Sequence, residues 1–184
     1  VDRDARFPSE AFQALKAAKL LSCYVPVELG GMGLTISELS KLCETLALYC
    51  ASTAMVFAMH QIQVGCIVHH ALGSEPFRDF AKELVERQHL IASSTTELGT
   101  GGDVRTSICA VEVTGGAFTL DKQAPVISYG EAADAILVTC RSSPGAGPND
   151  QSHVLVKKRD CVLKPLSGWD TLGFRGTCSA GFAL

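Results

Sequence analysis

Hydroxyl-bearing residues and glycines gather in one segment, Leu90–Asp103, directly after an apolar run. Its polar and flexible members are Thr95, Thr96, Gly99, Gly101 and Gly102. Because glycine reaches backbone conformations closed to other residues, such a loop can bring backbone N–H groups close to a flat polar ligand. The next residues, Ser107–Val113, are again typical of a strand, which excludes the strand-to-helix phosphate turn of a dinucleotide fold or a P-loop. The segment therefore predicts a different architecture for a nucleotide cofactor.

Thr95, Thr96 and Ser128 are candidates to donate hydrogen bonds, from hydroxyl or backbone groups, to the pyrimidine edge of a flavin. Negative charge builds up at that edge on reduction, so donors help most there. The alternative is that these are ordinary strand residues. Two carboxylates, Glu97 and Asp103, lie in the same loop, but no pattern marks either as a general base. We expect Asp103 to hold the turn.

Other candidate residues have simpler interpretations. No cysteine or serine nucleophile motif accompanies His60 or the pair His69–His70, so we expect these to be core or cap histidines. Arg175 stands between glycines at 173 and 176, where a guanidinium can grip a carboxylate or carbonyl groups of a ligand. The alternative, which we favour, is an ion pair that fixes the path of the chain.

The composition predicts a globular protein that binds a small molecule. The chain has 184 residues, of which 47% are hydrophobic, and a formal net charge of -3. Without a lysine or arginine cluster there is no electrostatic basis for binding nucleic acid. The eight cysteines are scattered, with no C-x-x-C motif and no zinc-type spacing, so we expect small buried side chains, no metal site and a reducing, cytoplasmic location.

The longest apolar stretch, residues 51–72, predicts a buried core helix and not a membrane span. Its polar members, His60, Gln61, Gln63, His69 and His70, would be costly in lipid. At the N-terminus, residues 1–6 lack the apolar core of a signal peptide and begin without methionine. Since the chain also stops within an apolar run, Ser179–Leu184, we expect it to be a fragment of a longer protein.

The first half of the chain predicts four helices. We expect a helix from Glu10 to about Lys19 capped by Ser9, and then an extended piece over Leu20–Val27. Thr35 and Glu38 fit a capping box that opens a helix with apolar positions at Leu39, Leu42, Cys43, Leu46 and Cys50. A helix from about Ala54 to Leu72 should end at a left-handed cap on Gly73, and Ser74 should cap a last helix running through Val85.

From Leu90 onward, short runs rich in Val, Ile and Thr alternate with turns, which predicts an antiparallel sheet or barrel. We expect a hairpin of Val111–Val113 with Ala117–Leu120, and strands over Ala135–Cys140 and Val154–Lys158. Helices followed by strands indicate an α+β protein. The predicted domains are an N-terminal α-helical domain, residues 1–89, and a β-domain, residues 90–184, truncated at its C-terminal end.

Three blocks resemble the acyl-CoA dehydrogenase family. Residues 25–34 are similar to the family turn V-P-x-E-x-G-G-x-G, and residues 96–103 to its loop T-E-P-x-A-G-S-D. Residues 172–177 are similar to its segment L-G-x-R-G-S/T. The blocks occur in the family's order and span nearly the whole chain. The family consists of flavoproteins with an N-terminal helical domain, a middle β-domain and a C-terminal four-helix bundle, and the resemblance implies the first two here.

The resemblance implies a FAD cofactor and α,β-dehydrogenation of an acyl-CoA thioester in fatty acid metabolism. It places Thr95 and Thr96 at the flavin pyrimidine edge, and Val126, Ile127 and Ser128 in a strand against the isoalloxazine ring. Gly102 takes the place of the loop serine that touches the thioester arm of the substrate. Two departures are Val126, where an aromatic residue is usual, and Leu98, where the loop has proline.

The resemblance also implies what the chain lacks. The family's catalytic base, a glutamate, and most of its oligomer contacts lie in the C-terminal bundle, so this chain carries no catalytic residue and should be inactive alone. The intact protein is expected to be a homodimer or homotetramer, with an electron acceptor that the sequence leaves open. Two other hypotheses are a flavin-dependent monooxygenase on the same fold and a degenerate scaffold without catalysis.

Overall fold

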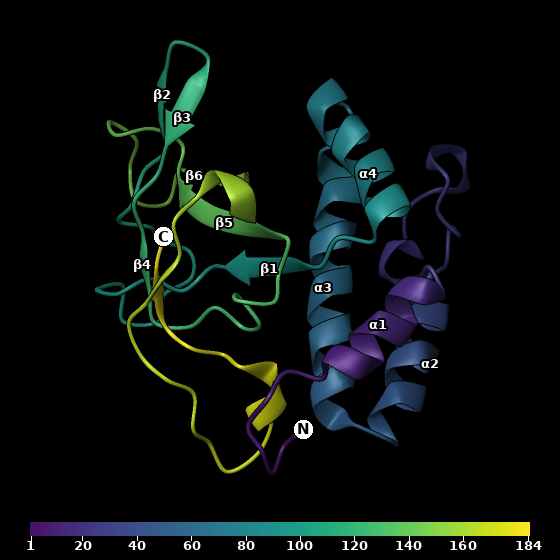
Figure 1. The fold of residues 1–184 in the computed structure, drawn as a ribbon. Helices are drawn as coiled ribbons and strands as arrows, with labels where there is room; N and C mark the ends of the chain where they lie inside the picture. Colours follow the sequence, from purple (N-terminus) through teal and green to yellow (C-terminus); the bar gives the residue numbers. More distant parts are fainter. The chain divides into compact units, whose positions relative to one another are not determined.

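The computed structural model describes residues 1–184, which form two compact units (Figure 1). The first unit contains Val1–Ile91 and Asp170–Cys178, and the second contains Ala92–Trp169 and Ser179–Leu184. The chain therefore returns to the first unit for a short segment near its end. Whether residues 1–89 also fold alone as a domain stays a prediction.

The first unit is helical, and the four predicted helices are confirmed. They are α1 (Ser9–Ala17), α2 (Ile36–Ala47), α3 (Ala51–His70) and α4 (Glu75–Arg87). Short 3-10 turns complete the unit, namely η1 (Leu20–Ser22), η2 (Val27–Leu29) and η4 (Arg175–Thr177). The expectation of an extended piece over Leu20–Val27 is wrong, because η1 and the start of η2 turn the chain there.

Helix α3 is the core of this unit, as predicted from its long, largely apolar sequence. By length and composition alone it could cross a membrane, but 56% of its most apolar window is buried inside the fold. His60 is fully buried, with its Nε2 2.7 Å from the carbonyl oxygen of Leu21 and its Nδ1 3.0 Å from the backbone nitrogen of Ile91. Since the Ile91 N–H donates to Nδ1, Nε2 carries the proton. The prediction of a core histidine is confirmed.

The ends of the helices follow the predicted chemistry only in part. The capping box at the start of α2 is confirmed: the Thr35 hydroxyl accepts from the Glu38 N–H, and the Glu38 carboxylate accepts from the Thr35 N–H. Ser9 is not a cap, because α1 begins at Ser9 itself and Pro8 precedes it. Ser74 stands at the predicted N-cap of α4 but makes no side-chain cap hydrogen bond. The prediction of a left-handed cap at Gly73 is wrong, since α3 ends three residues before it, at His70, and Ala71 is its C-cap.

The second unit is built from short strands in three small sheets. The strands are β1 (Ile91–Ser94), β2 (Glu112–Thr114), β3 (Ala117–Thr119), β4 (Gln123–Ala124), β5 (Ala135–Arg141), β6 (Gln151–Lys157), β7 (Lys164–Pro165) and β8 (Phe182–Ala183). The sheets have the orders β1-β5-β6, β2-β3 and β4-β8-β7. The predicted hairpin is confirmed as the antiparallel pair β2–β3, and the two predicted longer strands are β5 and β6, paired antiparallel. The α+β fold class is confirmed.

Strand β5 is the buried centre of its sheet. Six of its residues, Ala135–Cys140, are buried, because β5 lies between β1 and β6 and packs on both faces. Cys140 packs there with Cys109 and Val111 in an apolar cluster, and neither thiol forms a disulfide. This core supports the loops that carry the candidate site.

Candidate functional site

The loop after β1 is joined directly to the segment that contains Val126. The Thr96 hydroxyl donates a hydrogen bond of 3.1 Å to the carbonyl oxygen of Val126, and the hydroxyls of Ser93 and Thr95 lie 3.0 Å apart. The structure thus brings together two segments separated by 30 residues in the sequence. The backbone N–H of Thr96, by contrast, donates to no acceptor in the chain.

The residues Val126–Ser128 do not form the expected strand. β4 ends at Ala124, and Pro125, which has no N–H to donate to a ladder, separates it from this segment. Ile127 is fully buried and its N–H donates to Ala180 over 2.8 Å, whereas Val126 is 37% exposed. The hydroxyls of Ser128 and Ser179 lie 2.8 Å apart. Val126 and Ser128 are therefore accessible to a ligand, and Ile127 anchors them.

The glycine-rich part of the loop is a turn with an open position. Gly102 has φ of +87°, and an added Cβ there would meet no atom within 4 Å, so the space a serine side chain would take is free. Asp103 accepts a hydrogen bond of 3.0 Å from the Arg105 N–H, and this bond lowers the pKa of its carboxyl group. The prediction that Asp103 holds the turn is confirmed.

The second carboxylate of the loop, Glu97, is bound by backbone groups. It is 8% exposed, and its two oxygens accept hydrogen bonds from the N–H groups of Ile108, at 3.0 Å, and Cys109, at 2.6 Å. The Thr100 hydroxyl donates to the Glu97 carbonyl oxygen. Each oxygen of the carboxylate thus accepts a backbone hydrogen bond, so Glu97 closes the loop as a structural residue.

Lys122 was missed by the sequence reasoning. Its side chain is 1% exposed, and the ammonium donates to the carbonyl oxygens of Ser94 at 2.9 Å, Thr95 at 3.2 Å and Thr139 at 2.6 Å. Burial lowers its pKa. The signal was present, because a period of two puts residue 122 on the same face as Ala124, which is fully buried.

Arg175 is a structural residue, as favoured from the sequence. Its guanidinium pairs with Asp170 at 3.1 Å, and its backbone N–H donates to the Asp2 carboxylate at 2.8 Å. The backbone at Gly176 lies close to the Val1 side chain, since a Cβ added at Gly176 would lie 2.3 Å from it. Among residues 1–184, no group of His, Cys, Asp and Glu is arranged to hold a metal ion.

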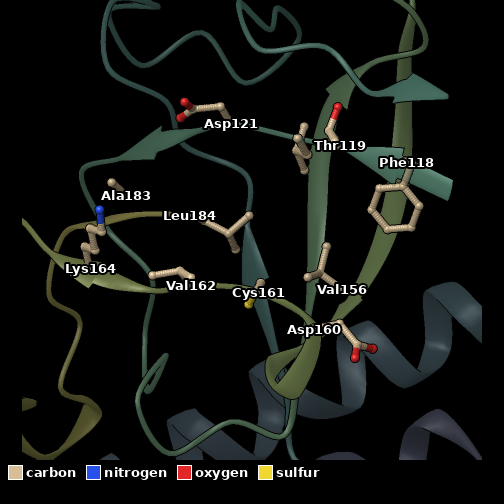
Figure 2. A pocket seen from close by; sticks show the side chains of 11 residues that line it. Phe118, Thr119, Asp121, Val156, Asp160, Cys161, Val162, Lys164, Ala183 and Leu184 are labelled. Atoms are coloured by element: carbon tan, nitrogen blue, oxygen red, sulfur yellow. The ribbon is translucent and has the colours of Figure 1, made fainter. Parts of the chain in front are cut away.

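The second unit contains a cavity of about 420 Å³ that none of the predicted site residues lines (Figure 2). One side consists of Phe118–Asp121 and the other includes Asp160–Val162 and Lys164, with Ala183 and Leu184 at one end. Leu184 exchanges two backbone hydrogen bonds with Lys122, in line with β8. The backbone groups of Leu120, Asp121 and Val162 make no such bonds. The cavity thus lies between the segment that precedes β4 and the segment that precedes β7.

Comparisons with known proteins find a family model that is similar to the first part of the chain. Residues 1–79 match the family model described as "Acyl-CoA dehydrogenase, N-terminal domain". The cyclohex-1-ene-1-carbonyl-CoA dehydrogenase of Syntrophus aciditrophicus (strain SB) is 28% identical over 161 residues, which are 86% of this chain and 38% of that protein. The chain therefore spans less than half the length of this relative.

Solved structures extend the likeness to the fold of the whole chain. An acyl-CoA dehydrogenase from Geobacillus kaustophilus superposes with a TM-score of 0.83 at 19% identity, covering 98% of this chain and 48% of that one. FMN-bound TdsC from Paenibacillus sp. A11-2 has a TM-score of 0.85 at 18% identity, covering 99% and 45%. Both of the predicted layers, helices and then strands, are included in these matches.

Proposed function

From the match of residues 1–79 to this family model and from the fold, we propose that the chain belongs to the acyl-CoA dehydrogenase family and that the intact protein is a FAD-dependent oxidoreductase. Its proposed reaction is α,β-dehydrogenation of an acyl-CoA thioester. The observation that carries the proposal is the hydrogen bond from Thr96 to Val126, which joins the two segments assigned to the flavin.

The residues at this place fit a flavin. The backbone N–H of Thr96 donates to no acceptor in the chain, as a group that binds a ligand would. Beside it, Val126 presents a half-exposed apolar side chain, which suits the face of an aromatic ring. Ser128 is partly exposed, and its hydroxyl can make a further hydrogen bond in addition to the one with the Ser179 hydroxyl.

In the proposed reaction the chain binds and orients the reactants. Bound flavin would supply an acceptor for a hydride. Thr95 and Thr96 would donate hydrogen bonds to the pyrimidine edge, while Val126, Ile127 and Ser128 would lie against the ring. Gly102 would leave room for the thioester arm of the substrate, since nothing in the chain fills the space beside it. We assign the catalytic base to no residue of 1–184.

Anaerobic addition of acyl-CoA to the intact protein tests this function. Oxidised flavin absorbs visible light, so bleaching on addition of butyryl-CoA or isobutyryl-CoA is the expected result. Coenzyme A without an acyl group, which cannot be dehydrogenated, is the control. A flavin-loaded protein that no acyl-CoA bleaches would contradict the proposal.

Val126 favours a second candidate, a flavin-dependent monooxygenase of the same fold. An aliphatic, 37% exposed side chain replaces the ring usual at this position, which leaves more room beside the flavin for oxygen chemistry. This enzyme would remain coloured with acyl-CoA, and its reduced flavin would consume oxygen faster when its substrate is present. Protein that purifies without colour and retains neither FAD nor FMN would instead indicate a non-catalytic scaffold.

For the rest of the protein, we propose a cytoplasmic enzyme that is a homodimer or homotetramer when intact. The absence of a basic cluster supports a small-molecule substrate, with no nucleic acid partner. Light scattering of the intact protein tests the oligomeric state, and a monomer would contradict it.

A further inference from the structure

A buried ammonium group lies directly beneath the Thr95–Thr96 backbone. Lys122 is 1% exposed, and each of its three N–H bonds has an acceptor, the carbonyl oxygens of Ser94, Thr95 and Thr139. No carboxylate forms an ion pair with it. Burying a cation on neutral acceptors is costly, and burial lowers the pKa of this group accordingly. An apolar side chain could fill this buried position without the free-energy cost of burying a charge, so packing alone does not explain Lys122.

The acceptors of Lys122 determine where two backbone donors point. Ser94 and Thr95 are consecutive, and both of their carbonyl oxygens converge on the one ammonium. The chain has no cis peptide bond, and in a planar trans peptide the C=O and the following N–H point in opposite directions. The N–H groups of Thr95 and Thr96 therefore point away from Lys122.

The side-chain contacts of the same loop leave the Thr96 N–H as the free donor. The Thr96 hydroxyl donates to Val126, whereas the Thr96 N–H has no acceptor in the chain. Thr139, the third acceptor of Lys122, belongs to buried β5, so the ammonium also fixes the end of β1 to the core. The direction of these donors is thus set before any ligand binds.

We propose that Lys122 is a positioning residue, which holds the N–H groups of Thr95 and Thr96 toward the pyrimidine edge of the flavin. The inference rests on the proposed function and adds to it the residue that sets the flavin's reduction potential. Since negative charge gathers at that edge on reduction, fixed donors stabilise reduced flavin more than oxidised flavin. Loss of Lys122 should therefore weaken the binding of reduced flavin more than the binding of oxidised flavin.

The test measures the dissociation constants of oxidised FAD and of dithionite-reduced FAD on the intact protein. In Lys122→Met we expect the ratio of the reduced to the oxidised constant to rise at least tenfold. For a two-electron couple a tenfold change in ratio corresponds to about 30 mV of midpoint potential, lowered in the variant. Lys164→Met, which removes an exposed lysine of the same unit, should keep the wild-type ratio. If Lys122→Met raised the dissociation constants of oxidised and reduced FAD by the same factor, Lys122 would have a purely structural role, and the proposal would be overturned.

Two further measurements decide the matter if Lys122→Met folds poorly. Lys122→Gln keeps two N–H donors without the charge, and its ratio should lie between those of the wild type and Lys122→Met. Without flavin, the amide resonances of Thr95 and Thr96 should shift in this variant, while those of Val113 and Phe118 in the β2–β3 hairpin stay in place. Unmoved Thr95 and Thr96 resonances would overturn the inference. Wild-type protein that binds no flavin would instead refute the proposed function, and the inference with it.

Discussion

The carboxylate of Glu97 accepts a hydrogen bond of 2.6 Å from the backbone N–H of Cys109, twelve residues further along the chain. Its other oxygen accepts from Ile108 at 3.0 Å, so one side chain closes the loop that carries Gly102. From the sequence alone, no pattern marked this glutamate as a general base, and its role stayed open. In the structure its carboxylate is the hydrogen-bond acceptor for the backbone N–H groups of Ile108 and Cys109.

Removing this carboxylate should destabilise the protein. Glu97→Ala leaves two N–H groups without an acceptor and should lower the free energy of unfolding by about 3 kcal/mol. Glu97→Gln keeps one acceptor oxygen and should cost roughly half as much. Urea unfolding measures both, with Glu112→Ala on the exposed β2 strand as the control. A Glu97→Ala protein as stable as this control would contradict the structural role.

The two N-cap residues of α2 and α4 offer a matched comparison. Thr35 accepts from the Glu38 N–H, whereas the Ser74 side chain makes no cap bond. Thr35→Ala should therefore cost about 1 kcal/mol, and Ser74→Ala should change stability by less than about 0.5 kcal/mol. Thermal and urea unfolding of the two variants give the difference. Equal losses would mean that the capping box does not stabilise α2.

Buried thiols should make the protein less stable in alkali. Burial raises the pKa of Cys23 from 9.0 to about 12 and that of Cys109 likewise. The unfolded thiol thus loses its proton near pH 9 and the folded one only near 12, so the folded state holds more protons between these values. Stability is complete below pH 9 and falls as the pH rises toward 12.

Cys23→Ala tests the sign and size of this effect. Each thiol contributes a slope of about 1.4 kcal/mol per pH unit within the window, so the variant should lose stability less steeply between pH 9 and 11. Urea unfolding at a series of pH values, under reducing conditions, measures both slopes. Below pH 8 the slopes of wild type and variant should coincide. A steeper alkaline slope in Cys23→Ala would contradict the assignment.

Local patterns were enough to predict the helices, the capping box and the β2–β3 hairpin. Thr35 and Glu38 are three residues apart, so their chemistry is visible in a short window of sequence. Lys122 was not predicted because its acceptors lie 17 to 28 residues away and belong to the backbone, whose direction no residue type reveals. The family resemblance led to Val126–Ser128, but it did not anticipate that Pro125 ends the strand before them.

The return of Asp170–Cys178 to the helical unit has a consequence for proteolysis. Because of this return, the backbone passes between the two units three times, after Ile91, after Trp169 and after Cys178. A protease that cuts the exposed turn at residues 142–150 would produce two fragments, each of which supplies part of both units. The nicked molecule should therefore migrate as one particle in a native gel and separate into its pieces only in denaturant.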